Sequence, residues 1–255
     1  MRQEPAGDFD YERSGDGYAQ IRRPEPAFAT RIRRALGGAS TLLNVGAGSG
    51  SYEPTDLTVT AVEPSASMRS QRPLHLTEAI DAVAEELPFD DDSFDAALAS
   101  VTVHQWRDLP AGLAEIRRVT TGPVVIMTFD PVALERFWLT DYAPEMMRIE
   151  SGRMPSIDLL GQLLGGQIAL EHLPIPHGCS DGFAEAFFGR PEAFLSDDVR
   201  RSQSAWGFVS PEEERRSVLA LTSALEDGSW DARHGALREA ATYDGSLRLV
   251  ISTRR

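Results

Sequence analysis

The sequence predicts an α/β protein whose core is a doubly wound sheet of seven strands. The first observation is a regular alternation of apolar strand-like runs and amphipathic helical segments up to Asp130. The second is an apolar run that ends in three closely spaced glycines, Leu42 to Gly50, which is typical of a ligand-binding turn after a parallel strand. The third is a final segment, residues 246–253, whose alternating pattern indicates a closing strand.

The expected elements follow in chain order. A helix over 26–36 ends at Gly37-Gly38, and further helices are expected over 65–71 and 109–119. Only twelve residues, 46–57, separate the first two strands, and Pro54 interrupts them, so we expect a first crossover helix of about one turn. The seven strands are expected over 41–45, 58–62, 78–83 (the weakest), 95–101, 123–129, 168–175 and 246–253.

Composition excludes several classes of protein. The 255 residues carry a net charge of -14, which opposes binding to the phosphates of nucleic acid. All 25 basic residues are arginines, so lysine Schiff-base chemistry is excluded. The single cysteine, Cys179, excludes an internal disulfide and a thiolate metal cluster and favours the cytoplasm. No apolar run approaches the roughly 18 residues of a membrane span, and we expect neither a membrane partner nor a bound metal.

The glycine turn indicates the kind of ligand. Glu63 ends the second strand beside the tip of the first, where a carboxylate can accept hydrogen bonds from both hydroxyls of a ribose. This pair predicts an adenosine-containing cofactor. The glycines stand at 46, 48 and 50, and the serine at 51 departs from the G-x-G-x-x-G spacing of dinucleotide sites. A nicotinamide oxidoreductase is therefore disfavoured, although it stays open as a third hypothesis.

Three matches in order carry a resemblance to a known family. The G-x-G-x-G at 46–50, Glu63, and the stretch Ala84-Glu85-Glu86-Leu87-Pro88-Phe89 up to Asp95 resemble class I S-adenosylmethionine-dependent methyltransferases of the ubiquinone-methyltransferase-like type (type 11). The resemblance implies a Rossmann-like sheet with the last strand antiparallel, and S-adenosylmethionine as cofactor. It also implies a helical substrate lid, inserted after strand five and between strands six and seven. Val83 departs from the Asp that many relatives carry there, which leaves adenine recognition to Ala84 and Glu85.

The resemblance divides the chain into a cap segment and helix (1–36), a cofactor-binding core (37–130), lid insertions with the sixth strand (131–245) and a closing strand (246–255). It implies that the segment before the first helix covers the methionine end of the cofactor, with Tyr18 and either Arg22 or Arg23 pairing with its carboxylate. The expected cofactor-binding residues are Tyr18, Arg23, Asn44, Gly46, Ala47, Gly48, Gly50, Glu63, Pro64, Met68, Ala84, Glu85, Ser100 and Val101.

The end of the fourth strand is where a reactive group can meet the cofactor, because ligands gather beyond the carboxyl ends of parallel strands. His104 is the candidate general base, since a histidine titrates near neutral pH; it could instead only hydrogen-bond a loop or pack on the cofactor. The expected substrate-pocket residues, some of which could equally be lid core, are Thr102, Trp106, Trp138, Tyr142, His177, Phe183 and Phe187.

Two functions stay open. The first is methyl transfer to a small, largely apolar organic acceptor, at oxygen or carbon rather than nitrogen, by a monomer or homodimer. The second is a protein that binds S-adenosylmethionine without methylating, as a cyclase, a rearrangement catalyst or a sensor. The sequence lacks an unambiguous base, which keeps the second function open.

Overall fold

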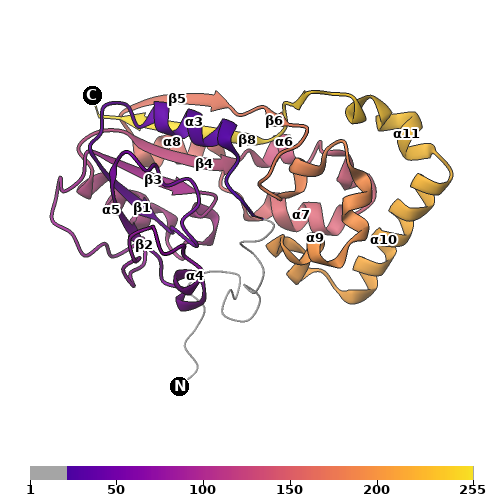
Figure 1. Ribbon diagram of the computed structural model, residues 1–255, viewed down its shortest axis with the longest axis horizontal. Helices are drawn as coiled ribbons and strands as arrows, with labels where there is room; N and C mark the ends of the chain where they lie inside the picture. The colour runs from indigo at the N-terminus through magenta and orange to yellow at the C-terminus, as the bar shows by residue number, and fades with distance from the viewer. Residues whose placement is uncertain (1–21, 255) are drawn as a thin grey trace, which may run out of the picture.

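The computed structural model describes residues 22–254, and its core is a six-stranded sheet with the order β2-β1-β3-β4-β8-β5 (Figure 1). Strands β1, β2, β3 and β4 are parallel, whereas β8 runs antiparallel to both of its neighbours, β4 and β5. The antiparallel pairing of the last two long strands is confirmed. The strands of this sheet are β1 (Thr41–Val45), β2 (Thr58–Val62), β3 (Ala96–Ser100), β4 (Val124–Phe129), β5 (Gln167–His172) and β8 (Leu247–Thr253).

The prediction of a seven-stranded sheet is wrong, because the sheet has six strands. The segment 78–83 contributes only an isolated bridge, in which Ile80 N donates to Ala61 O at 2.8 Å and Glu63 N donates to Ile80 O at 3.0 Å. Ile80 lies between Ala79 and Asp81 and is 40% exposed, so no continuous apolar face holds a full strand against β2.

Each face of the sheet is covered by helices, as its side-chain alternation requires. On one face, Leu42, Leu98 and Val125 pack with helix α3 (Pro26–Ala35). On the other face, Leu43 and Ala97 pack with α5 (Leu109–Val119) and α8 (Ile157–Leu164). The helix expected over 109–119 is confirmed with the same bounds, and Asp108 caps it by accepting from Ala111 N.

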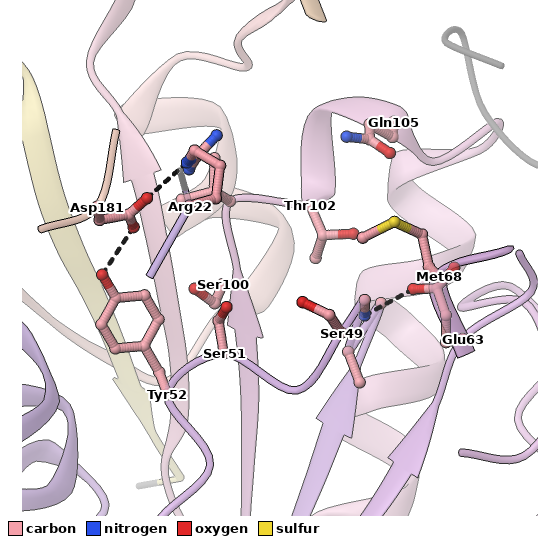
Figure 2. A pocket seen from close by; sticks show the side chains of 14 residues that line it. Arg22, Ser49, Ser51, Tyr52, Glu63, Met68, Ser100, Thr102, Gln105 and Asp181 are labelled. Carbon is pink, nitrogen blue, oxygen red and sulfur yellow. Dashed lines mark hydrogen bonds and ion pairs between the residues drawn. The ribbon is translucent and has the colours of Figure 1, made fainter. Parts of the chain in front are cut away.

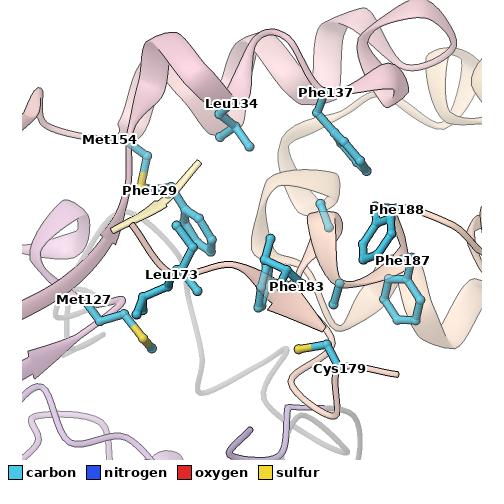
Figure 3. Close-up of a cluster of buried hydrophobic side chains, with 14 of the residues drawn as sticks. Met127, Phe129, Leu134, Phe137, Met154, Leu173, Cys179, Phe183, Phe187 and Phe188 are labelled. Atoms are coloured by element: carbon cyan, nitrogen blue, oxygen red, sulfur yellow. The ribbon is translucent and has the colours of Figure 1, made fainter. Parts of the chain in front are cut away.

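A second group of helices forms a lobe beside the sheet, which we call the helical lobe (residues 131–154 and 184–240; Figure 1). Its apolar core is continuous with the α3 face of the sheet, because Phe129 at the end of β4 packs against Phe183, and Leu134 and Phe137 join the same cluster (Figure 3). The elements of the lobe are α6 (Pro131–Leu134), η2 (Trp138–Asp141), α7 (Pro144–Arg153), η3 (Ala184–Phe187), η4 (Pro191–Leu195), α9 (Asp197–Arg201), η5 (Ser204–Phe208), α10 (Pro211–Glu226), α11 (Ser229–His234) and η6 (Gly235–Arg238).

A two-stranded antiparallel ribbon, β6 (Ile175–Pro176) with β7 (Thr242–Tyr243), lies where the chain enters and leaves the lobe. The remaining elements are α4 (Ala66–Ser70) and η1 (Val103–Gln105), which follow β2 and β3 at the carboxyl edge of the sheet. None of the helices in the described part of the chain has the length and apolarity that a membrane crossing requires.

The crossover between β1 and β2 contains turns and no helix, so the expected single turn of helix is wrong. A buried ion pair organises this loop instead, with Arg72 Nη2 3.0 Å from Glu53 Oε2 and Asn44 Nδ2 donating to Glu53 Oε1 at 2.9 Å. Gly50 lies so close to the facing loop that a Cβ there would be 2.3 Å from Leu76. Side chains from outside the loop thus hold it in place. A helix over the same residues would point Glu53 and Gly50 away from these partners.

A buried carboxylate joins the helical lobe to the sheet. Glu185 is fully buried in η3 and accepts hydrogen bonds from Ser246 N at 3.0 Å and Ser246 Oγ at 2.6 Å, directly before β8. Burial raises the pKa of Glu185 to about 7, although the bonds from Ser246 oppose the rise. A raised pKa means that the folded protein holds this proton at pH values where the unfolded chain has lost it.

We expect the stabilising contribution of protonated Glu185 to be complete below about pH 4.5 and lost as the pH rises through about 7. Glu185→Gln should remove this dependence, so that the free energy of unfolding of the wild type falls by about 2 kcal/mol relative to the variant between pH 5 and pH 8. Urea denaturation at several pH values measures it. Glu226→Gln, at an exposed position, is the matched control, and parallel profiles for wild type and Glu185→Gln would contradict the prediction.

Candidate functional site

A pocket enclosing about 580 Å³ of empty space, part of it open to solvent, lies beyond the carboxyl ends of β1, β2 and β3 (Figure 2). We call it the first pocket. The residues that line it are Arg22, Gly46, Ala47, Gly48, Ser49, Ser51, Tyr52, Glu63, Met68, Ser100, Val101, Thr102, Gln105 and Asp181.

The glycine turn forms one wall of the first pocket with bare backbone. Gly46 and Gly48 have φ angles of +65° and +52°, a region that residues with a Cβ rarely adopt. A Cβ on Gly46 would lie 2.1 Å from Thr102 Oγ1, and one on Gly48 would lie 3.3 Å from Met68 Cε. The turn can therefore approach a ligand and its neighbours only because these two positions are glycine.

Glu63 lies opposite this turn and faces the pocket rather than bulk water. The parallel register pairs Val45 with Val62, so the acid directly follows the strand beside the turn. Its carboxylate is 8% exposed and accepts hydrogen bonds from Gly48 N at 2.8 Å and Ser65 N at 2.9 Å. Burial raises the pKa of Glu63, and these two N–H donors oppose the rise. Each oxygen keeps a further lone pair with which it can accept a ribose hydroxyl.

Two residues that line the first pocket have a strained backbone. Val101, at the end of β3, has φ +50°, and Tyr52 has φ +65°. For a β-branched residue such as Val101 this conformation is rare and costs about 1–3 kcal/mol. A hydrogen bond from Val101 N to Met127 O at 2.8 Å helps to hold it in place. The residues that follow this strained position include Thr102 and Gln105, which also line the first pocket.

Arg22, Asp181 and Tyr52 form an ionic network on one side of the first pocket (Figure 2). Arg22 Nε donates to Asp181 Oδ1 at 2.5 Å, and the Tyr52 hydroxyl donates to Asp181 Oδ2 at 2.7 Å. Glu25 N donates to the Tyr52 hydroxyl, and Ser180 N donates to Glu25 Oε2 at 2.9 Å. Burial and the neighbouring Asp181 charge raise the pKa of Tyr52. The network thus fixes the Arg22 guanidinium beside the pocket.

A second pocket adjoins the first and lies between the sheet and the helical lobe. It contains about 370 Å³ of empty space, part of it open to solvent, and three of its residues, Arg22, Val101 and Gln105, also line the first pocket. The residues that line only the second pocket are His104, Phe129, Glu150, Phe183, Ala184, Gln203 and Ser204. A ligand in one pocket is therefore a direct neighbour of a ligand in the other.

The structure brings many of the sequence-predicted residues together and leaves others apart. Those that line the first pocket are Gly46, Ala47, Gly48, Glu63, Met68, Ser100, Val101 and Thr102, and those that line the second include His104 and Phe183. Tyr18 lies outside the described residues. Arg23 is exposed and does not line either pocket, whereas Arg22 lines both, so the alternative assignment to Arg22 fits the structure.

Several predicted cofactor residues support the site from behind instead of lining it. Asn44 is buried and holds Glu53, and Gly50 permits the close approach of Leu76. Pro64, Ala84 and Glu85 are likewise absent from both linings. The Glu85 carboxylate accepts from Asp108 N at 3.1 Å, which ties its loop to the start of α5.

Most of the aromatic residues predicted for the substrate pocket belong to packed cores. Trp138 donates from Nε1 to Phe188 O at 2.8 Å and packs edge-on against Tyr142, and neither residue lines the first or the second pocket. Phe187 packs on Phe194, His177 on Phe188, and Trp106 fills the space beside Gly112. These side chains carry large apolar surfaces. Trp138, Tyr142 and Phe187 pack within the helical lobe, whereas Trp106 packs with the apolar cluster on the α5 face of the sheet.

Sequence reasoning missed other lining residues. Tyr52 was missed, because it meets Asp181, which is 129 positions away, only through the fold. Phe129, Glu150, Gln203 and Ser204 were missed for the same reason. Position Phe129 carried a usable signal, because it ends a strand whose carboxyl edge was expected to face ligands.

Comparison with known proteins gives consistent results. Residues 43–126 match the model of a family described as a methyltransferase domain. A crystal structure from Anabaena variabilis, of a candidate methyltransferase from an antibiotic biosynthesis pathway, superposes with a TM-score of 0.84 at 29% identity, covering 92% of this chain and 99% of that one. No curated protein sequence matches the chain at a significant level.

Two more distant structures share the fold. An S-adenosylmethionine-dependent methyltransferase of Thermotoga maritima superposes with a TM-score of 0.57 at 15% identity, covering 96% of this chain and 98% of that one. The [4+2]-cyclase SpnF superposes with a TM-score of 0.50 at 16% identity, covering 99% of this chain and 87% of that one.

The sheet order, the glycine turn with its facing acid and the family match define the class of protein. The chain is a class I S-adenosylmethionine-dependent methyltransferase with a Rossmann-like α/β fold. S-adenosylmethionine is its cofactor. The first pocket presents backbone free of Cβ atoms at Gly46 and Gly48 and a buried acceptor at Glu63.

Glu63→Gln should weaken binding of S-adenosylhomocysteine by about 10- to 100-fold, because hydrogen bonds to a charged acceptor contribute about 1.5–3 kcal/mol. Titration calorimetry measures it. The matched control is Glu86→Gln, an exposed position with the same change of charge. Equal affinities for the two variants would show that Glu63 does not hold the ribose.

Proposed function

We propose that this enzyme transfers the methyl group of S-adenosylmethionine to an oxygen or carbon atom of a small organic acceptor held in the second pocket. The observation that carries the proposal is the junction of the two pockets at Arg22, Val101 and Gln105. A methyl donor in the first pocket and an acceptor in the second would meet at this junction.

The residues of the first pocket fit the parts of the cofactor. Glu63 would accept hydrogen bonds from the ribose hydroxyls, and the N–H groups of the turn at Gly46 to Gly48 would face the amino-acid tail. Arg22, fixed by Asp181, would pair with the carboxylate of that tail. When bound, the cofactor supplies a methyl group on a positively charged sulfur, which is its own leaving group.

What remains for the protein is to position the acceptor and exclude water. In-line transfer needs the nucleophilic atom about 3 Å from the methyl carbon, so orientation supplies most of the rate enhancement. Phe129 and Phe183, with ring centroids 5.2 Å apart, contribute apolar surface to the second pocket. Such surface favours a planar or apolar acceptor and keeps the reacting atoms dry.

His104 is our candidate for accepting a proton from the acceptor. It lies in η1 directly after β3 and lines the second pocket, so it is next to the junction where the methyl group would arrive. An O–H or an acidic C–H must lose its proton to become a strong nucleophile, and an imidazole suits this step near neutral pH. We assign this role to His104 as a proposal.

The helical lobe is our candidate for the substrate lid. Glu150 and Gln203 reach the second pocket from the lobe, while Val101 and Phe129 reach it from the sheet. An acceptor enclosed between the two parts would be contacted from both sides.

Incubation with methyl-labelled S-adenosylmethionine and a panel of phenols, enols and amides separates the open functions. We expect label in an acceptor together with S-adenosylhomocysteine as co-product. If a compound is consumed while all label stays on the cofactor, the enzyme uses the cofactor without methylating. If His104→Asn leaves the rate of transfer unchanged, the histidine is not the base.

Arg22→Gln should weaken binding of S-adenosylhomocysteine by about 10-fold or more and leave binding of 5′-methylthioadenosine nearly unchanged, because only the former carries the carboxylate. Arg23→Gln is the matched control, since it removes an exposed neighbouring charge. Titration calorimetry with both ligands measures the difference. An equal loss for both ligands would contradict a contact with the carboxylate.

A further inference from the structure

The second pocket contains a buried amide that the fold does not use. Gln203 is 6% exposed, and its Oε1 and Nε2 are both buried. Neither atom has a hydrogen-bond partner within the part of the chain that the structure describes. Buried side-chain amides in folded proteins are normally paired, because burying an unpaired donor and acceptor reduces stability.

The structural work at this position is done by the backbone alone. Gln203 precedes η5; its N–H donates to Arg200 O at 3.1 Å and its carbonyl accepts from Trp206 N at 3.2 Å. The side chain contributes no bond to this turn, so an apolar side chain of similar size would preserve it. The side-chain amide of Gln203 therefore has no role in the fold, and its two polar atoms are available to form hydrogen bonds with a ligand.

The position of Gln203 indicates where such a ligand lies. It lines the second pocket on the side of the helical lobe, together with Ser204 and with Glu150 from α7. Phe129 and Phe183 line the same pocket. A planar molecule with a polar edge could thus rest its apolar body near the two rings while its edge meets the amide.

The donor and acceptor of the Gln203 amide determine which polar groups on a ligand can pair with it. One side presents a C=O acceptor and an N–H donor side by side, which pair with another carboxamide or with a lactam through two parallel hydrogen bonds. An ammonium group could satisfy only the acceptor. A carboxylate could satisfy only the donor and would leave the amide oxygen of Gln203 unpaired.

We propose that Gln203 is a specificity-determining residue, which selects acceptors that carry a neutral carboxamide or lactam edge on a planar body. This inference rests on the proposed function, in that it takes the second pocket to be the acceptor site. It also goes further, because it names the chemical group by which the acceptor is recognised.

The test uses small probes with the wild-type protein, with and without saturating S-adenosylhomocysteine. Benzamide and 2-pyridone carry the paired donor and acceptor, acetophenone keeps only the acceptor, and benzoate adds a charge. We expect benzamide and 2-pyridone to bind at least about tenfold more tightly than acetophenone and benzoate, since a mismatched probe leaves part of the Gln203 amide unpaired. Ligand-observed NMR titration measures the affinities.

The decisive variant is Gln203→Leu, which keeps the size of the side chain and removes both polar atoms. We expect it to abolish the preference for benzamide over acetophenone and to melt at or above the wild-type temperature, because an unpaired buried amide has been removed. Ser202→Ala is the matched control at a buried neighbour that does not line the pocket, and it should keep the wild-type preference.

Three results would overturn the inference: no benzamide binding up to about 10 mM, which corresponds to a very weak complex; equal affinity of the wild type for all four probes; or a preference that survives in Gln203→Leu. A melting temperature of Gln203→Leu well below that of Ser202→Ala would assign the side chain to the fold instead. If S-adenosylhomocysteine does not bind while the probe preference is intact, the proposed methyl transfer fails and the amide-selective pocket stands.

Discussion

The site depends on the parallel pairing of β1 with β2. Their register places Val45 beside Val62, so the turn after the first strand and the acid after the second lie at one edge of the sheet. The Glu63 carboxylate then accepts from Gly48 N and from Ser65 N, and it fixes both the glycine turn and the start of α4. Because these bonds use only part of its acceptor capacity, the same carboxylate can support the turn and still meet a ribose.

Two polar links fix the position of the helical lobe relative to the sheet. Asp181 binds both Arg22 and Tyr52, and in this way it ties the segment before α3 and the glycine loop to the chain that enters the lobe. Glu185 and Ser246 make a second link a few residues later, between the lobe and β8. Two polar links across a continuous apolar core set the lobe in one orientation, and that orientation creates the second pocket.

Three buried polar groups in this molecule show two different roles. Glu53 with Arg72 and Glu185 with Ser246 have partners within the fold, and their effect is to hold loops and lobes together. The Gln203 amide has no partner in the described structure and lines a pocket instead. A buried amide with no role in the fold costs stability, which a protein can recover when a ligand pairs with it.

The sequence by itself determined the local elements and the cofactor side of the site. Strands β1 and β2, helix α5, the glycine turn and Glu63 follow from apolar periodicity and from residue types a few positions apart. It did not determine that residues 78–83 would pair at Ile80 alone, since this depends on how much apolar surface the neighbouring strand offers. Nor did it separate Arg22 from Arg23.

Only the tertiary structure decided which distant residues meet. Asp181 with Tyr52, and Gln203 with Phe129, come together because the helical lobe returns to the carboxyl edge of the sheet. The same packing places Trp138 and Phe187 in the core of the helical lobe and not in the expected substrate pocket. Residue type alone could not show this, because large aromatic side chains occur both in cores and in the walls of cavities. Local pattern fixes backbone geometry over a few residues, whereas a pocket is defined by surfaces that the chain brings together from far apart.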